Sequence, residues 1–242
     1  MKKIFAGNWK LNKNPSETRR FLHQLKSHEA QLDAELIVFP PATSWEASGS
    51  ALLDSKITWG AQNVCSQGSG AFTGENSGVV LKDLGGKFVL VGHSERRHLF
   101  GESDTLLADK VAFVQALDLT PVLCVGETLP QREAQQTNEI NRTQLQLGLA
   151  KADRTKRLIV AYEPVWAIGT GKVATEQQVL QAHDFVATFL QELGFSNAAL
   201  LYGGSVKPDN SASLLKIPHV DGFLIGGASL DVETFVKIIR GH

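Results

Sequence analysis

The sequence predicts an α/β protein, a closed (β/α)8 barrel in a single domain over residues 1–242. Its length is one at which α/β barrels form a single domain. Its apolar runs are too short for helices, and they are continuous, which is typical of parallel strands buried on both faces. Segments of helical period separate these runs, so we expect repeated βαβ units and a barrel.

Eight apolar runs are the predicted strands: residues 3–7, 36–39, 57–61, 88–92, 121–125, 158–162, 199–203 and 222–225. Helical period is clear over residues 105–117, 175–193 and 231–239. Thr175 and Gln178 form a predicted capping box at the start of the second of these helices, and Gly194 is a stop signal after it. A doubly wound open sheet is the competing architecture.

Charge and cysteine content exclude several classes of protein. The formal net charge is -1 without a long basic run, so we expect no nucleic-acid partner. No apolar segment approaches the roughly 18 residues that span a membrane. The polar residues Asn8, Lys10 and Asn12 interrupt the apolar N-terminal run before it reaches the length of a secretory signal. Cys65 and Cys124 have neither disulfide nor zinc-site spacing, which favours reduced thiols and a cytoplasmic location.

Polar residues follow several predicted strands, where the active site of a barrel forms. Asn8 and Lys10 follow the first strand, His93 and Glu95 the fourth, and Glu163 the sixth. Burial beside apolar neighbours should raise the pKa of Glu163, which suits a general base. Taken singly, these residues could also be a strand end, a solvated cation, a helix cap or a salt-bridged carboxylate.

Two glycine clusters follow the last two strands. Gly203 and Gly204 precede Ser205, and Gly226 and Gly227 end the final strand. Glycine allows the backbone to approach an anion closely, and barrels often bind phosphate in these two loops. The pattern predicts a phosphate site, although ordinary tight turns would use the same residues.

A predicted lid follows Glu163. It consists of Pro164, Val165, Trp166, Ala167, Ile168, Gly169, Thr170, Gly171 and Lys172. Proline restricts one end, the glycines allow folding over an anion, and the apolar side chains would exclude water on closure. The alternative is an exposed loop without a role.

Other motifs fail on inspection. Val173 stands where a P-loop needs Ser or Thr, and the segment that begins at Gly92 lacks the final glycine of a nucleophile elbow. The seven histidines show no HExxH pattern. We therefore expect no metal and no cofactor.

Five segments together resemble the triosephosphate isomerase family. They are residues 6–10 (Ala-Gly-Asn-Trp-Lys), 92–97 (Gly-His-Ser-Glu-Arg-Arg), 161–172, 202–206 (Tyr-Gly-Gly-Ser-Val) and 226–230 (Gly-Gly-Ala-Ser-Leu). Their order and spacing match the family from residue 6 to residue 230. The resemblance implies a TIM barrel that interconverts dihydroxyacetone phosphate and D-glyceraldehyde 3-phosphate.

The resemblance also implies roles for individual residues. Glu163 would be the base that moves a proton between substrate carbons, and His93 would polarise the carbonyl group. Lys10 and Asn8 would hold the substrate and balance its charge, and Glu95 would be a further site residue. The phosphate ligands would be Gly169, Ser205, Gly226 and Gly227.

A homodimer is implied as well. Residues 67–75 resemble the family's loop that inserts into a partner subunit, with Phe72, Thr73, Gly74 and Glu75 at its tip. Two positions depart from the family pattern: Phe223, where a small residue is common, and Asn76, where Val is frequent. They could alter barrel packing and the interface respectively.

Two other functions compete with this one. One is that of another phosphate-binding barrel, such as an aldolase or a phosphoribosyl isomerase. A Schiff-base aldolase would need a buried lysine at the end of an inner strand, but the sixth strand ends in Glu163, and Lys10 is the only well-placed lysine. A barrel retained only for binding would have lost Glu163, His93 or Lys10, and all three are present.

Overall fold

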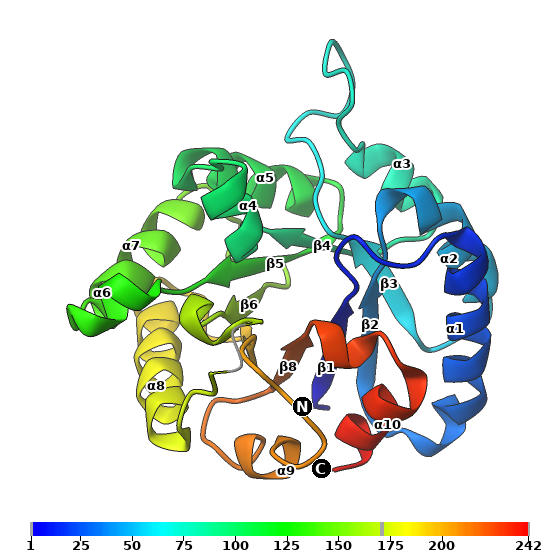
Figure 1. Cartoon of the computed structure of the whole chain (residues 1–242). Helices are drawn as coiled ribbons and strands as arrows, with labels where there is room; N and C mark the ends of the chain where they lie inside the picture. Colours follow the sequence, from blue (N-terminus) through cyan, green and yellow to red (C-terminus); the bar gives the residue numbers. More distant parts are fainter. Residues whose placement is uncertain (1, 170–171, 242) are drawn as a thin grey trace.

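The apolar runs form a closed ring of parallel strands with the helices on its outside (Figure 1). The computed structural model describes residues 2–169 and 172–241. The strands are β1 (Ile4–Asn8), β2 (Glu35–Phe39), β3 (Thr58–Ala61), β4 (Phe88–Val91), β5 (Thr120–Val125), β6 (Ile159–Tyr162), β7 (Ala199–Tyr202) and β8 (Gly222–Ile225). Each strand pairs with the next, and β8 pairs with β1, so the barrel is confirmed and the open sheet was the wrong alternative.

One or two helices follow each strand. They are α1 (Pro15–His28), α2 (Trp45–Ala51), α3 (Gly78–Asp83), α4 (Ser94–Leu99), α5 (Asp104–Ala116), α6 (Leu129–Glu133), α7 (Thr137–Gly148), α8 (Glu176–Glu192), α9 (Ser211–Leu214) and α10 (Val232–Arg240). Short 3-10 turns are η1 (Glu29–Gln31), η2 (Ala42–Ser44), η3 (Val165–Ala167) and η4 (Gly227–Ser229). The capping box of Thr175 and Gln178 is present at the start of α8, as predicted.

Predicted and observed bounds agree to within one residue for every strand and for the three predicted helices. Agreement is close because strands buried on both faces must be apolar throughout, and their ends coincide with polar or glycine residues. The most consequential difference is at β1, which extends to Asn8 and so carries a polar side chain on the strand itself.

Two layers of apolar side chains fill the molecule. One cluster lies inside the barrel and alternates along the strands, as with Ile159 and Ala161 on β6. The other lies between the strands and the helices and includes Val160 and Tyr162 of the same strand. Phe223 belongs to this outer layer, where its ring meets Phe5 edge-on at 5.8 Å between centroids, so the departure at this position leaves the barrel interior unchanged.

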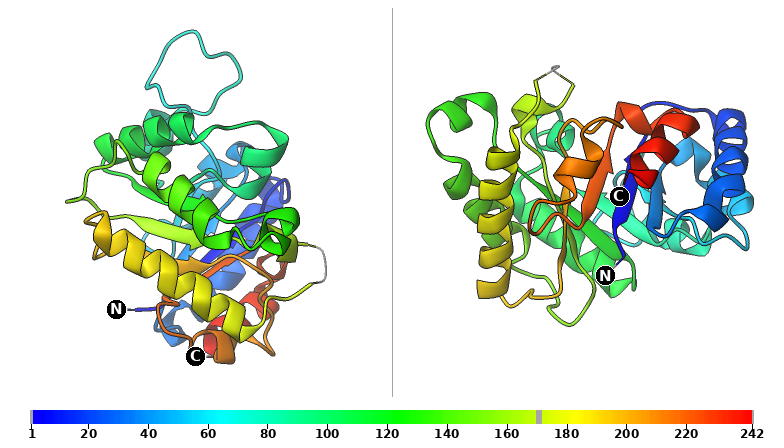
Figure 2. Two further views of the ribbon diagram at one scale, coloured as in Figure 1. Left: turned by 90° about the vertical axis from the view of Figure 1, so that its left-hand side faces the viewer. Right: turned by 90° about the horizontal axis from the view of Figure 1, so that it is seen from below.

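The loop between β3 and α3 projects from the barrel (Figures 1 and 2). It carries Phe72, Thr73, Gly74 and Glu75, all exposed. At its base the Cys65 N–H donates to the carbonyl oxygen of Asn76 at 2.8 Å. The loop is therefore tied where it leaves the barrel, while its tip lies away from the rest of the chain.

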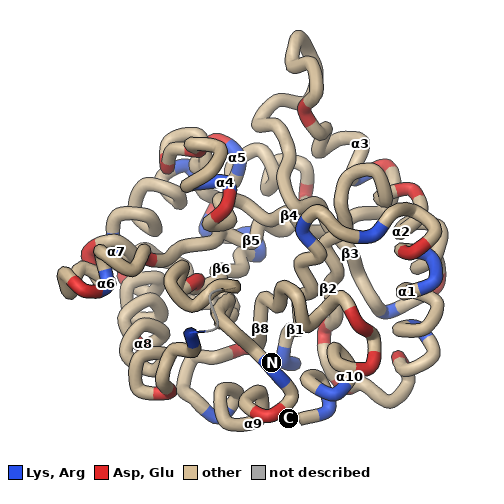
Figure 3. The backbone as a smooth tube through the Cα atoms, viewed as in Figure 1, with Lys and Arg blue, Asp and Glu red and all other residues tan. Residues whose placement is uncertain are grey.

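Charged residues of both signs are interspersed around the outside of the barrel (Figure 3). Both cysteines are free and buried. Within residues 2–169 and 172–241, no helix is long and apolar enough to cross a membrane.

His183 on α8 generates a prediction about stability. Its ring is fully buried, and Nδ1–H donates to the carbonyl oxygen of His219 at 2.9 Å, while burial lowers its pKa to about 4. The unfolded chain, with an ordinary histidine pKa of about 6.5, binds this proton more readily. Stability should therefore fall as the pH drops from about 6.5 to 4, by at most about 3 kcal/mol from this group.

Urea unfolding of the wild type and of His183→Asn across this pH range checks the prediction. Asparagine can still donate to the His219 carbonyl but does not titrate, so the variant should lose less stability on acidification than the wild type. Parallel curves for the two proteins would contradict the prediction.

Candidate active site

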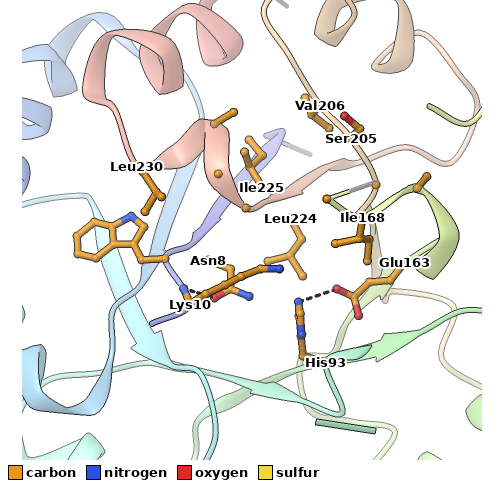
Figure 4. A pocket seen from close by; sticks show the side chains of 18 of the residues that line it. Asn8, Lys10, His93, Glu163, Ile168, Ser205, Val206, Leu224, Ile225 and Leu230 are labelled. Atoms are coloured by element: carbon orange, nitrogen blue, oxygen red, sulfur yellow. Dashed lines mark hydrogen bonds and ion pairs between the residues drawn. The ribbon is translucent and has the colours of Figure 1, made fainter. Parts of the chain in front are cut away.

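A hollow of about 330 Å³ opens at the carboxyl ends of the strands (Figure 4). Eight of the residues predicted from the sequence line it: Asn8, Lys10, His93, Glu163, Gly169, Ser205, Gly226 and Gly227. They come from the ends of five strands and from the lid. Barrel closure therefore gathers residues that lie more than 200 positions apart in the sequence.

Strand alternation places Glu163 over the barrel interior. Ile159 and Ala161 point inward on β6, and Glu163 is the next residue with the same parity. On the neighbouring β7, Gly203 faces it, and a Cβ added there would lie 2.9 Å from Cγ of Glu163. Glycine at this position is therefore needed to leave room for the carboxylate.

His93 and Glu163 form a buried pair. His93 Nε2 lies 3.0 Å from Oε1 of Glu163, as the dashed line in Figure 4 shows. His93 caps α4, and its Nδ1 accepts the backbone N–H of Glu95 at 3.2 Å. This bond fixes the tautomer of His93, because Nδ1 must be unprotonated to accept a hydrogen bond. Nε2 therefore carries the proton and donates a hydrogen bond to Glu163.

At this pair, hydrogen bonds and neighbouring charges shift each pKa in the direction opposite to the effect of burial. Burial alone would raise the pKa of Glu163, but His93, the Ser94 N–H at 2.9 Å and Lys10 outweigh it and lower the pKa. The prediction from the sequence that the pKa of Glu163 is raised is therefore wrong for this arrangement. Burial lowers the pKa of His93, yet the adjacent Glu163 carboxylate outweighs burial and raises it, so the helix N-terminus is not the dominant influence here.

Lys10 lies beside the pair. Its backbone is left-handed, with φ of 51°, and its N–H donates to Oδ1 of Asn8 at 3.0 Å. Its ammonium group lies 2.6 Å from Oε1 of Glu95. Asn8 and Glu95 thus hold the two ends of Lys10, and they direct its cation to the mouth of the barrel.

The glycine loops form the opposite wall of the hollow. Ser205 follows β7, and η4 begins at Gly227, directly after β8. A Cβ on Gly227 would have no heavy atom within 4 Å, and one on Gly226 would lie 3.6 Å from Cε of Lys10. The space beside these two glycines is open, as an anion site requires.

The lid begins as the turn η3 directly after Glu163 and Pro164. Ala167, Ile168 and Gly169 line the hollow. The predicted lid residues Thr170 and Gly171 lie outside the described residues.

Glu127 is a residue that the sequence analysis missed. It is fully buried after β5 and accepts hydrogen bonds from the Tyr162 hydroxyl at 3.0 Å and from Nε1 of Trp166 at 3.0 Å. Its own carbonyl accepts from the N–H of Val165 at 3.1 Å. Glu127 therefore anchors the first turn of the segment predicted to be a lid. Its position just past a strand could have flagged it by the same rule that found Glu163.

The described residues contain no group of three or more His, Cys, Asp or Glu side chains that could hold a metal ion. What the hollow does contain is a carboxylate, an imidazole that donates from Nε2, a cation and two glycine loops. Fold and site together define a barrel enzyme that moves protons on a small anionic substrate.

Comparison with known proteins identifies the family. The triosephosphate isomerase family model matches residues 3–242. A triosephosphate isomerase of Bdellovibrio bacteriovorus is 60% identical over 98% of this chain and 99% of that protein. Those of Thiobacillus denitrificans and Syntrophotalea carbinolica are 47% and 44% identical, over 99% and 98% of this chain and 98% and 97% of their own lengths. The chain belongs to the triosephosphate isomerase family.

The coupling of His93 to Glu163 generates a prediction. His93→Gln removes the strongest interaction that offsets the effect of burial, so the pKa of Glu163 should rise above its wild-type value. Carboxylate titration by NMR with labelled glutamate measures the change.

His98→Gln is the matched control, because His98 lies exposed on the same short helix α4. It should leave the titration of Glu163 unaltered. A Glu163 pKa that stays the same in His93→Gln would show that His93 does not hold the carboxylate ionised.

Proposed function

We propose that the protein interconverts dihydroxyacetone phosphate and D-glyceraldehyde 3-phosphate through an enediolate, the isomerase step shared by glycolysis and gluconeogenesis. Membership of the family supports the reaction. The observation that carries the mechanism is the buried contact of 3.0 Å between Glu163 and His93, beside two glycine loops. A cytoplasmic location fits an enzyme of this pathway and remains part of the proposal.

We assign to Glu163 the transfer of a proton between two carbon atoms of the substrate. Its carboxylate is ionised at neutral pH, since its pKa lies below the ordinary value. A contact of 3.0 Å to His93 leaves no space for substrate atoms, so the carboxylate turns away from His93 when substrate enters between them. The carboxylate then loses a hydrogen bond that stabilised its charge, and it becomes a stronger base.

Polarisation of the carbonyl oxygen is assigned to His93. In this arrangement Nε2–H of His93 donates a hydrogen bond to Glu163. Once Glu163 turns away, the same N–H group can donate to the substrate oxygen. Glu163 is also the chief cause of the raised pKa of His93, so its departure lowers that pKa while burial still acts. His93 then works as a neutral imidazole that donates from Nε2, and the Glu95 N–H continues to hold Nδ1.

Charge balance and binding are assigned to the remaining residues. Lys10 and Asn8 would stabilise the negative charge that develops on the substrate oxygens, and Glu95 would orient Lys10. Ser205, Gly226, Gly227 and Gly169 would bind the phosphate group through N–H donors. Closure of the lid, which carries Ile168, would exclude water from the enediolate.

Isomerase assays of the wild type and Glu163→Asp test this assignment. The shorter side chain withdraws the carboxylate by one methylene, and a displacement of about 1 Å can cost roughly 100-fold in rate. We expect kcat to fall by about that factor with the fold intact by circular dichroism.

The exposed residue Glu176 supplies the control, since Glu176→Asp shortens a carboxylate on the outside of the barrel. Full activity of Glu163→Asp would remove Glu163 from the role of base. An inactive wild type would overturn the proposed reaction itself.

The site also supports a homodimer. Leu11, Phe72 and Phe100 are exposed apolar side chains on the side of the projecting loop, and Leu11 is 97% exposed. A second hollow of about 420 Å³ lies next to the first and includes Lys10, Glu95 and Phe100 in its lining. We infer that the loop tip of a second subunit, with Thr73, fills this hollow and backs Lys10 and Glu95.

Light scattering of wild type and Phe72→Asp tests the dimer. A charge at the loop tip should give a monomer, and kcat should fall by at least about 10-fold because Lys10 and Glu95 lose their support. Leu147→Asp is the control, because Leu147 is 46% exposed on α7, away from the loop. A monomeric wild type with full activity would contradict the inference.

A further inference from the structure

The loop after β8 is held from the inside by Ser229. Its hydroxyl donates to the carbonyl oxygens of Ile225 at 3.0 Å and Gly226 at 2.7 Å. The turn η4 closes with the N–H of Leu230, which donates to the carbonyl oxygen of Gly227 at 3.1 Å. The two glycines of the proposed phosphate site thus begin a single short turn whose far end is Leu230.

A lysine from the other end of the chain holds that far end. Lys13 Nζ donates to the carbonyl oxygen of Leu230 at 2.8 Å. Leu230 also lines the hollow, as labelled in Figure 4. A single ammonium group therefore links the segment that follows Asn8 at the end of β1, and that carries Lys10, to the loop after β8.

Aromatic rings fix the position of this ammonium group. Lys13 Nζ lies 5.5 Å from the ring centroid of Trp9 and 4.6 Å from that of Phe21. Trp9 and Phe21 are buried and pack edge-on at 4.9 Å. Cation–π attraction to two buried rings restricts a side chain that is normally mobile.

The backbone of Lys13 is strained. Its φ of 70° lies in the left-handed region, where glycine is favoured and a side chain is disfavoured. Its carbonyl oxygen accepts the Ser44 hydroxyl at 3.2 Å, which helps to hold this conformation. A lysine at such a position contributes through its side chain, because glycine would serve the backbone better.

We propose that Lys13 is a positioning residue for the phosphate group of the substrate, acting through the loop after β8. It binds the carbonyl at one end of η4, so the N–H groups of Gly226 and Gly227 at the other end keep fixed places beside the hollow. The proposal rests on the proposed function, because that function makes this loop a phosphate site. Lys13 itself has no place in proton transfer.

The experiment compares wild type with Lys13→Met, Lys13→Arg and Lys13→Gly. It measures Kd for inorganic phosphate, KM and kcat, each at low salt and at about 0.5 M NaCl. Methionine keeps the apolar stem and loses the donor, whereas arginine keeps charge and donor. Glycine tolerates the left-handed backbone, so this variant removes the side chain without adding backbone strain.

Lys207→Met is the matched control for charge. Lys207 is exposed and lines the same hollow after β7. Removing it takes away one positive charge without touching the loop after β8. A purely electrostatic effect is screened by salt, whereas an effect of loop position persists.

We expect Lys13→Met and Lys13→Gly to raise Kd for phosphate and KM by about 5-fold, with kcat within about twofold, at both salt concentrations. Lys13→Arg should recover most of the affinity. The effect of Lys207→Met should shrink at high salt.

Unchanged Kd and KM in Lys13→Gly would overturn the proposal, as would an effect that salt abolishes. A fall in kcat with KM constant would also overturn it. If the wild type binds phosphate more tightly than Lys13→Gly but lacks isomerase activity, the proposed function fails and the role of Lys13 stands.

Discussion

The alternation of side chains along the strands is the constraint on which the site depends. Inward residues of β6 fill the barrel, and the next inward position after the strand is Glu163. The same rule gives Asn8 at the end of β1, after Ile4 and Ala6. Polar groups at these positions cost stability because the interior below them is apolar, and hydrogen bonds to neighbouring loops offset that cost.

The contact between His93 and Glu163 offsets the cost of burying both groups. Each group lowers the cost of burying the other, and the Ser94 and Glu95 N–H groups hold them from α4. The pair is stable while it is closed on itself. In the proposed mechanism, a substrate that separates the pair would make the carboxylate more basic and the imidazole less so, as proton transfer requires.

Local patterns made the fold and much of the site predictable. Buried strands must be apolar, and the capping box of Thr175 is a contact within one turn, so both are visible in the sequence. The two glycine clusters and Glu163 could be recognised because each directly follows an apolar run predicted to be a strand. The resemblance to a family then supplied the roles of these residues.

Contacts between distant segments were not predictable. The pKa of Glu163 depends on His93 and Ser94, which are about 70 residues away, and burial alone gave the wrong direction. Glu127 meets Trp166 across 39 residues, and Lys13 meets Leu230 across 217. Nothing in the neighbouring sequence specifies such pairs, because tertiary packing decides them.

Closure of the barrel between β1 and β8 has a consequence for synthesis of the chain. Ile4 of β1 pairs with Gly222 of β8, so β1 is synthesised long before its partner strand. At about 5–20 residues per second, that delay is on the order of ten seconds or more. During it the free edge of β1 can pair with other chains, and a truncated product would lack the loop after β8 that we propose as part of the phosphate site.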